Sequence, residues 1–178
     1  MIEVEKKFRL TKRQRDAVLR RLPEMGASLQ GEEFEENTLY SGEGLSSGSC
    51  VLRLRRVGRN ATLTYKKRIP SSASIKQQRE EETEVADADA MEAILGALGF
   101  TPALVYEKRR QTWTLGKTEI VIDVLPFGLF MEIEGRANEI KNVERKLGLK
   151  GLRAEHATYP QLTEKHGKLY DGLIEARF

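Results

Sequence analysis

Hydrophobic and charged residues alternate in several short segments of the chain, and this alternation predicts β-strands. Successive side chains of a strand point to opposite faces, so residues two positions apart share a face. In residues 2–10 one face is charged, through Glu3, Glu5 and Lys7. The other face is mainly apolar, through Ile2, Val4 and Phe8. The segment is therefore predicted to be a strand whose two faces have different surroundings.

The same two-residue spacing of charges returns in three later segments. The pairs are Arg53 and Arg55, Lys108 and Arg110, and Glu132 and Glu134. A charged strand face is ordinarily the solvated one. Here the spacing recurs, and the basic and acidic pairs stand in separate strands. This recurrence indicates one constellation, in which carboxylates hold cations while Lys and Arg hold an anion with many oxygen atoms.

Alternation and turn residues together predict about eight strands. They span residues 2–10, 29–40, 50–57, 61–67, 77–85, 103–114, 117–125 and 128–135. The short connection at residues 58–60 predicts an antiparallel hairpin. Residues 42–49 are rich in Gly and Ser, and residues 69–74 contain Pro70 and three serines, so both segments are predicted loops.

Helices are predicted between the strands from apolar residues that recur at helical spacing. The first begins with a capping box of Thr11 and Gln14, and Pro23 and Gly26 end it. A last helix is predicted over about 160–166, since proline favours a first turn.

Two more helices lie between these in the sequence. One begins at Asp87 or Asp89 and ends at Gly99, and the other is capped by Asn138 and closed by Gly148. The apolar stripe of the former is predicted to pack in the core: Met91, Ile94, Leu95 and Leu98. Helices that cover the apolar face of an antiparallel sheet leave its charged face to surround a ligand. The pattern thus predicts an α+β barrel with a polar interior and helices outside.

The composition fits one globular domain. The chain has 178 residues, of which 39% are hydrophobic and 32% charged, which excludes a disordered chain. The net charge of +3 comes from 30 basic and 27 acidic residues, so a basic patch must arise by local segregation. There is no long basic run, so extended nucleic acid is not an expected partner. Neither a membrane-spanning apolar run nor a cysteine other than Cys50 is present, and a cytoplasmic protein is expected.

A series of motifs resembles the CYTH family, also called the triphosphate tunnel metalloenzymes. The motifs are Glu3-Val-Glu5-Lys-Lys7, Leu52-Arg53-Leu54-Arg55, Leu63-Thr-Tyr-Lys66, Lys108-Arg-Arg110, Asp123 and Phe130-Met-Glu132-Ile-Glu134. They follow one another in the family's order from Glu3 to Glu134, and the resemblance extends through Tyr159. The family includes class IV adenylate cyclases, thiamine triphosphatases and inorganic tripolyphosphatases. The resemblance implies a single CYTH domain over residues 1–178, folded as a closed tunnel of eight antiparallel strands.

The resemblance and the residue chemistry together give candidate site residues. Five carboxylates form a hard oxygen set for Mg²⁺ or Mn²⁺: Glu3, Glu5, Asp123, Glu132 and Glu134. The expected triphosphate ligands are Lys7, Arg53, Arg55, Lys66, Arg79, Lys108 and Arg110, because Lys and Arg match phosphate oxygens.

The candidate catalytic residues are Lys7, Lys66 and Glu81. Lys7 or Lys66 could act as a base if surrounding cations lower its pKa. Alternatively, the metal alone activates water. The family match of Arg79-x-Glu81 implies that Glu81 assists a second metal or orients water. The family often has a further acidic residue where this chain has Thr83. Glu82 or Glu84 would replace that acid only if the strand register differed.

Three functions remain open at this point. The first is a metal-dependent triphosphatase that hydrolyses tripolyphosphate, thiamine triphosphate or a nucleoside triphosphate. The second is a class IV adenylate cyclase, which would make cyclic AMP and pyrophosphate from ATP. The third is a non-catalytic module that binds polyphosphate or nucleic-acid ends. If no metal were bound, the carboxylates interleaved with the basic residues would repel an anionic ligand. Their presence therefore favours a metalloenzyme over a simple binding module. The protein is expected to be a monomer or homodimer, with a small-molecule substrate and no membrane partner.

Overall fold

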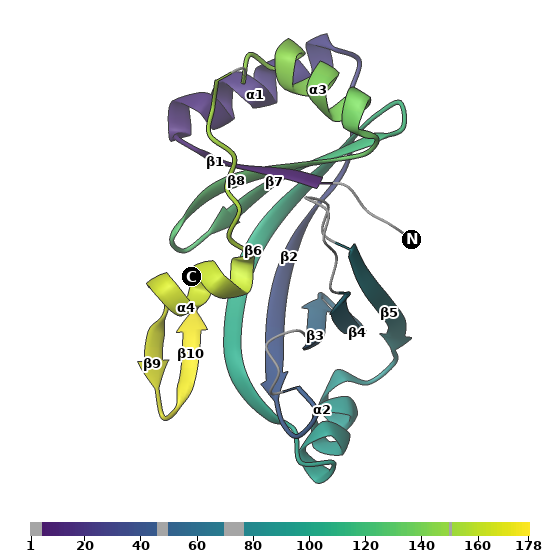
Figure 1. Cartoon of the computed structure of the whole chain (residues 1–178), viewed down its shortest axis with the longest axis vertical. Coiled ribbons are helices and arrows are strands. Elements are labelled where there is room, and N and C mark those ends of the chain that lie inside the picture. Colours follow the sequence, from purple (N-terminus) through teal and green to yellow (C-terminus); the bar gives the residue numbers. More distant parts are fainter. Residues whose placement is uncertain (1–4, 46–49, 70–76, 150) are drawn as a thin grey trace. The chain divides into compact units, whose positions relative to one another are not determined.

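The computed structural model describes residues 5–45, 50–69, 77–149 and 151–178 (Figure 1). The strands are β1 (Glu5–Leu10), β2 (Ser28–Ser41), β3 (Cys50–Val57), β4 (Asn60–Ile69), β5 (Gln77–Val85), β6 (Thr101–Leu115), β7 (Thr118–Leu125), β8 (Gly128–Glu134), β9 (Lys168–Tyr170) and β10 (Leu173–Ala176). The helices are α1 (Lys12–Glu24), α2 (Ala88–Ala97), α3 (Ala137–Lys146) and α4 (Tyr159–His166).

Eight strands follow one another in the sheet in the order β1-β8-β7-β6-β2-β3-β4-β5. The register is antiparallel in β1·β8, β7·β8, β6·β7, β2·β3, β3·β4 and β4·β5. The α+β class and the antiparallel eight-stranded sheet are therefore confirmed. The predicted closed tunnel would require the two ends of this order, β1 and β5, to pair. The strand order contains no such pairing among the described residues. Closure by backbone hydrogen bonds is thus not confirmed.

The free edge of β1 has another partner. The backbone N–H of Glu155 donates to the carbonyl of Lys7 at 2.8 Å, and Phe8 forms an isolated antiparallel bridge with Ala154. Backbone groups at a sheet edge need partners. The segment after α3 provides them here, so these edge groups are not left for a further strand.

The chain divides into two compact units. Among the described residues, the first unit contains 35–107 and 159–177, and the second contains 5–34, 108–158 and 178. Strands β2 and β6 each contribute one part to each unit.

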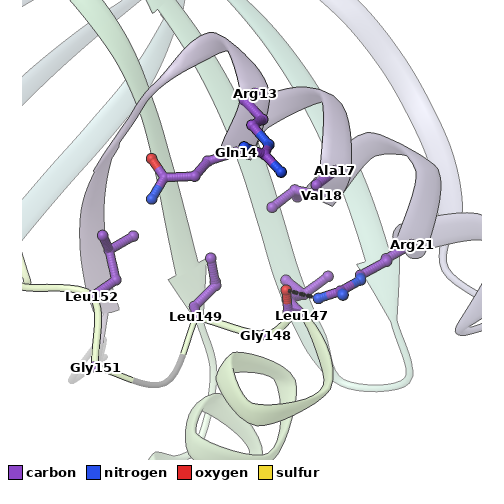
Figure 2. A pocket seen from close by; sticks show the side chains of 10 residues that line it. All are labelled: Arg13, Gln14, Ala17, Val18, Arg21, Leu147, Gly148, Leu149, Gly151 and Leu152. Atoms are coloured by element: carbon purple, nitrogen blue, oxygen red, sulfur yellow. Dashed lines mark hydrogen bonds between the residues drawn. The ribbon is translucent and has the colours of Figure 1, made fainter.

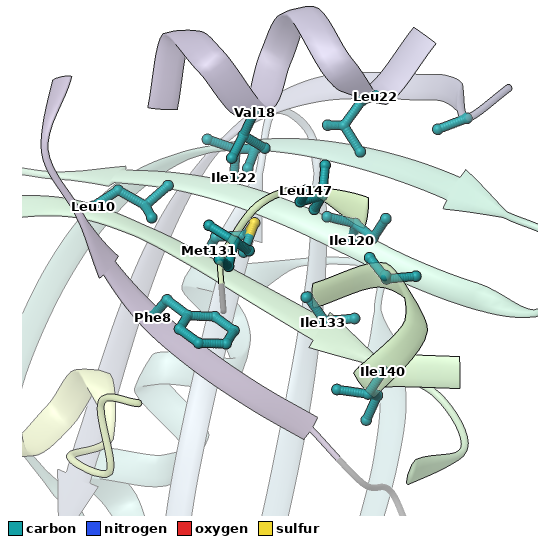
Figure 3. Close-up of a cluster of buried hydrophobic side chains, with 13 residues drawn as sticks. Phe8, Leu10, Val18, Leu22, Ile120, Ile122, Met131, Ile133, Ile140 and Leu147 are labelled. Carbon is teal, nitrogen blue, oxygen red and sulfur yellow. The ribbon is translucent and has the colours of Figure 1, made fainter. Parts of the chain in front are cut away.

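In the second unit, α1 and α3 cover the apolar face of β1, β7 and β8 (Figure 3). The core side chains include Phe8, Ile120, Met131 and Ile133, all with 0% exposure. Because Lys7 and Phe8 are neighbours on β1, the core and the charged groups lie on opposite faces of the same strand. The predicted division between an apolar, helix-covered face and a charged face is confirmed for this unit.

The helix boundaries of this unit differ in two places from the sequence prediction. Helix α1 has the predicted capping box, in which Thr11 Oγ1 accepts from the Gln14 N–H. However, α1 continues past Pro23 to Glu24. A proline removes one backbone N–H donor and crowds the carbonyl four residues earlier, and here it stands in the last turn, where only one more helical residue follows. The predicted cap of α3 at Asn138 is wrong: Arg136 is the N-cap, and Glu139 accepts from its N–H at 3.1 Å.

In the first unit, α2 packs through Leu95, which is 4% exposed, against the apolar side of strands β2–β5. Its N-cap is Asp87, as predicted. The predicted core stripe is only partly correct, because Ile94 is 52% and Leu98 67% exposed. A single helix laid on a sheet buries one side, and these two residues lie outside it.

The C-terminal hairpin of β9 and β10 was not predicted, and β10 pairs parallel to β6. Its strands have only three and four residues, too few for a clear alternation. The sequence does contain a signal for this hairpin, because Asp171-Gly172 is a common hairpin-turn dipeptide. In the structure both residues have positive φ. No described helix is long and apolar enough to cross a membrane.

Candidate anion and metal site

In the second unit, five charged side chains from four strands form one network on the face opposite the core. The antiparallel register sets Lys7 opposite Glu132, Arg110 opposite Asp123, and Val121 opposite Glu132. The members are Lys7, Lys108, Arg110, Asp123 and Glu132, each of which was a sequence-derived candidate. The structure therefore brings these five predicted residues together.

Asp123 is the centre of this network and is fully buried, with 0% exposure. Arg110 binds it through two nitrogens, with Nε at 2.8 Å from Oδ1 and Nη2 at 2.6 Å from Oδ2. The same Nη2 donates to Glu132 Oε2 at 2.9 Å, and Lys108 Nζ lies 3.7 Å from Asp123 Oδ2. Two-point Arg–carboxylate pairing fixes geometry as well as charge. Asp123 thus orients the cations of this network.

Lys7 is held between a strand and the segment after α3. Its Nζ lies 3.1 Å from Glu132 Oε1 and donates to the carbonyl of Ala157 at 3.3 Å. Glu155 accepts from the Ala157 N–H at 2.9 Å. Lys7 is only 7% exposed, so its ammonium group is positioned on a well-defined site rather than in solvent.

Further carboxylates form a row across three neighbouring strands. Glu5 stands opposite Glu134 on β8, and Glu134 stands opposite Glu119 on β7. Like charges in directly opposed positions repel, and a divalent cation with oxygen ligands would offset the repulsion. Glu119 is a residue that the sequence analysis missed, although its spacing from Asp123 along β7 places it on the same face.

The proposed metal ligands are only partly gathered. Glu5 and Glu134 are neighbours, whereas Asp123 and Glu132 are engaged by Arg110. Glu3 lies outside the described residues. Within the described ranges, no group of three Asp, Glu, His or Cys residues could hold a metal ion. The donor atoms are all carboxylate oxygens, so their chemistry fits Mg²⁺ or Mn²⁺.

In the first unit, Arg53 and Arg55 project from the face of β3 opposite the buried Leu52 and Leu54. Arg53 Nη2 donates to Thr64 Oγ1 at 3.2 Å. Thr64 in turn donates to Glu82 Oε2 at 2.8 Å, and Arg53 lies 3.9 Å from that oxygen. The prediction that the two arginines share a face is confirmed.

Both arginines carry a buried donor that lacks a hydrogen-bond partner among the described residues. The atoms are Arg53 Nε and Arg55 Nε. Asn37 Oδ1 is a buried acceptor that likewise lacks a hydrogen-bond partner among the described residues. Arg55 Nε has only an ion pair with Glu35, at 3.7 Å. An unsatisfied buried donor costs about 1–3 kcal/mol. An anion with several oxygens would satisfy both guanidinium groups.

Three buried polar residues of this unit were not among the predicted site residues. Asn37 is 0% exposed and donates to Glu35, which is 1% exposed, at 3.3 Å. Burial raises the pKa of the Tyr106 hydroxyl and Glu35 adds to the rise, while the nearby Arg53 and Arg55 oppose it. The two-residue spacing of Glu35 and Asn37 could have indicated a shared face. Tyr106 gives no such signal, because an aromatic residue in an apolar strand resembles core.

The register of β5 decides which of its acids face the arginines. Thr64 pairs with Glu82, Lys66 with Glu80 and Thr62 with Glu84, and Lys66 Nζ lies 2.7 Å from Glu80. Directly paired residues share a face. Glu81 pairs with Tyr65 and so belongs to the opposite face. The structure thus places Glu80, Glu82 and Glu84, not Glu81, on the face of Arg53 and Arg55. Arg79 is paired with Lys67 in the register, and its side chain lies outside the described part of the structure.

The structure is an α+β protein whose antiparallel sheet carries Lys, Arg and carboxylate side chains on one face. The chain belongs to the CYTH domain family, whose match covers residues 1–159. The resemblance found in the sequence is therefore confirmed. No curated protein matches the chain.

Several solved structures share this fold. PH1012 from Pyrococcus horikoshii OT3 is 26% identical, with a TM-score of 0.76, covering 90% of this chain and 98% of that chain. A proposed adenylate cyclase from Vibrio parahaemolyticus is 22% identical, with a TM-score of 0.68, covering 89% and 95%. HpAC1 from Hippeastrum, a proposed adenylyl cyclase described as having dominant triphosphatase activity, is 19% identical, with a TM-score of 0.69, covering 95% and 98%. At the last two levels of identity the likeness concerns the fold alone.

Proposed function

We propose that this protein is a divalent-metal-dependent triphosphatase that hydrolyses a phosphoanhydride bond of a small-molecule triphosphate. The observation that carries the proposal is the pair of buried, unsatisfied guanidinium donors, Arg53 Nε and Arg55 Nε, in the described part of the chain. Donors of this kind suit a ligand with many acceptor oxygens. Membership of the CYTH family and the name of HpAC1 support hydrolysis as the reaction.

The cationic residues would bind and orient the phosphates. In the second unit, Lys7, Lys108 and Arg110 surround Asp123 and Glu132. Phosphate oxygens match such cations. In the first unit, Arg53, Arg55 and Lys66 would contribute further phosphate ligands. We retain Arg79 only as an expectation from the family, because its side chain lies outside the described part of the structure.

The carboxylates would hold the metal. Glu5 and Glu134 are neighbours across two strands, and Glu3, Asp123 and Glu132 complete the proposed set. When bound, Mg²⁺ or Mn²⁺ would neutralise charge on the phosphate oxygens as the bond breaks. The contribution of Asp123 would be indirect, because it orients Arg110 through two hydrogen bonds.

We assign the orientation of the attacking water to Glu82 in place of Glu81. Glu82 lies on the face of Arg53 and accepts a hydrogen bond from Thr64, whereas Glu81 lies on the other face. Lys7 and Lys66 remain the candidate bases. In the structure they form ion pairs with Glu132 and Glu80 respectively, so a role as base would require the substrate to replace these partners.

An adenylate cyclase is the second candidate function. The name of the Vibrio parahaemolyticus protein favours it, and both reactions would use the same phosphate and metal ligands. Non-catalytic binding of polyphosphate or nucleic-acid ends is the third candidate. We further propose a cytoplasmic monomer or homodimer.

Product analysis distinguishes these functions. The purified protein is incubated with Mg²⁺ or Mn²⁺ and, separately, with tripolyphosphate, thiamine triphosphate and ATP. We expect metal-dependent release of orthophosphate. Cyclic AMP together with pyrophosphate would instead identify a cyclase. Binding of a triphosphate without formation of any product would indicate a non-catalytic binding module.

Variants test the residues behind the activity. Arg53→Gln should lower kcat/KM roughly 10- to 100-fold, the effect of losing a hydrogen bond from a charged donor. Arg59→Gln is the matched control, because Arg59 is an exposed residue of the β3–β4 turn and its loss should change little. Glu132→Gln should abolish metal-dependent turnover. Equal effects of Arg53→Gln and Arg59→Gln would refute the assignment of Arg53.

A further inference from the structure

A cleft lies in the second unit between α1 and the segment that follows α3 (Figure 2). Its volume is about 370 Å³, within the range of small-molecule sites. Residues of its wall, such as Val18 and Leu147, belong to the core that packs on the apolar face of β1, β7 and β8. The cleft therefore lies on the opposite side of this sheet from Lys7 and Glu132, and it belongs to neither of the clusters described above.

The floor of the cleft is apolar. Ala17 and Val18 contribute from α1, and Leu147, Leu149 and Leu152 contribute from the other wall. Because Val18, Leu147 and Leu149 are at most 5% exposed, they form a fixed surface backed by the core. Ala17 and Leu152 are partly exposed. Such a floor favours an apolar group that leaves water.

The rim of the cleft is cationic. Arg13 and Arg21 are eight residues apart on α1, with Ala17 midway between them, so all three share one helix face about 12 Å long. None of the described lining residues is acidic. Arg13 forms no hydrogen bond or ion pair with any described residue, and its guanidinium is open to an anion.

Arg21 is fixed across the cleft. Its Nη1 donates to the carbonyl of Leu147 at 2.6 Å, and its guanidinium lies over Gly148. Gly148 has a φ of +72°, a conformation that residues with side chains rarely adopt. The remaining N–H groups of Arg21 make no hydrogen bond that involves another described residue. A guanidinium held in this way needs little reordering to bind an anion.

The charge distribution of α1 also favours an anionic ligand. The helix has five basic residues, two acidic ones, and no acidic residue in its first turn. Lys12 and Arg13 therefore stand where the helix dipole is already positive, an arrangement that is unfavourable for a cation. An anion near Arg13 would offset this repulsion.

We propose that the cleft between α1 and residues 147–149 and 151–152 binds a small amphipathic anion, with its carboxylate on Arg13 and Arg21 and a short apolar chain on the floor. The ligand class follows from the combination of a cationic rim and an apolar floor. A simple inorganic anion would use only the rim, and a neutral apolar molecule only the floor. This binding is independent of the proposed triphosphatase activity.

Octanoate is the probe that combines both features, with acetate and 1-octanol as probes of the head and the chain alone. Titration of the ¹⁵N-labelled protein should give saturable shifts of amide signals around Ala17 and Leu149 with octanoate. Acetate should shift them far less at the same concentration, and 1-octanol should bind more weakly. Equal binding of acetate and octanoate, or no saturable binding of octanoate, would overturn the proposal.

Charge variants test whether the rim is specific. Arg13→Gln should weaken octanoate binding by about fivefold, the upper end of the effect of losing one exposed charged pair. Arg20→Gln removes the same charge from the same helix outside the cleft and should leave binding within about twofold. Neither residue makes a described contact that the fold needs, and circular dichroism would verify this. Equal weakening by both variants would show nonspecific attraction to α1 and overturn the proposal.

Discussion

Asp123 shows how one buried residue can control several charged neighbours. Its carboxylate has 0% exposure and is bound by Arg110 through two hydrogen bonds, with Lys108 nearby. Burial of a charge is tolerable when partners compensate it, and removing one partner leaves the others uncompensated. The family position of Asp123 predicted a metal ligand. The structure adds an organising role that spacing alone does not reveal, because hydrogen-bond partners depend on register.

Asp123→Asn should therefore destabilise the protein by about 3–5 kcal/mol, since Lys108 would stay buried beside a neutral amide and Arg110 would lose its two-point partner. Urea unfolding measures the loss. Asp16→Asn is the control: Asp16 is 57% exposed and pairs only with Arg15, so its loss should fall within about 0.5 kcal/mol. A loss below about 1 kcal/mol for Asp123→Asn would contradict the view that the cations depend on this carboxylate.

Tyr40 provides a pH-dependent contribution to stability. Burial raises the pKa of its hydroxyl, and the nearby Glu92 carboxylate, which accepts its hydrogen bond at 3.2 Å, raises it further. The folded protein thus holds this proton above pH 10, where an unfolded chain loses it. Stability from this group is fully present below about pH 10 and falls as the pH rises further.

Urea midpoints at pH 8.5 and pH 10.5 test this linkage. The wild-type midpoint should fall more between the two pH values than that of Tyr40→Phe, because the variant has no hydroxyl to ionise. Lysine titration affects both proteins alike and cancels in the comparison. Equal falls in the two proteins would show that Tyr40 does not contribute.

At the scale of elements, alternation predicted strands such as β1 and β3 well because one face of each is mainly apolar and the other is charged. The bounds of β3 and β5 agree with the prediction to the residue. In α2, by contrast, helical spacing identified Ile94 and Leu98 as core, and both are exposed. Spacing defines the apolar stripe of a helix but not how much of the stripe its neighbours cover.

Register is the feature of the strands that sequence could not give. Moving β5 by one residue exchanges its two faces, and β5 carries acids on both: Glu80, Glu82 and Glu84 on one, Glu81 on the other. A pattern that is charged on both faces fits either register equally well. The assignment of Glu81 from the family therefore depended on a choice that only the paired strands resolve.

A pair of cysteines tests this register. In a Cys50→Ser background, Thr62→Cys with Glu84→Cys should form a disulfide under mild oxidation, because these residues are directly paired and paired Cα atoms lie about 4.5–5.5 Å apart. Thr62→Cys with Thr83→Cys is the control and should remain reduced, since its side chains point to opposite faces. Mass spectrometry detects the bond. Preferential cross-linking of the control pair would place Glu81, not Glu82, beside the arginines.

At the scale of the whole molecule, the sequence identified the family and the sheet, whereas closure of the tunnel rests on the family alone. The order of motifs sufficed for the family, which matches residues 1–159. Closure depends on long-range pairing of β1, whose edge carbonyl at Lys7 is bonded to Glu155. Local patterns contain no information on such a contact. The prediction of one domain likewise requires a test of cooperativity.

We expect the two compact units to unfold in one transition, because β2 and β6 each run through both of them. Breaking either strand in one unit removes part of the same strand from the other. Small domains typically unfold cooperatively for this reason. Two proteins with a single tryptophan can report on the units separately. Trp113 serves the second unit in the wild-type chain, and Phe100→Trp with Trp113→Phe serves the first.

The fluorescence midpoint in urea should be the same in each protein as the midpoint of its own circular dichroism transition. This internal comparison controls for any change in stability caused by the substitutions. A fluorescence transition that precedes the loss of secondary structure in either protein would mean that its unit unfolds alone. Residues 1–178 would then contain two folding units instead of a single CYTH domain, even though they share strands.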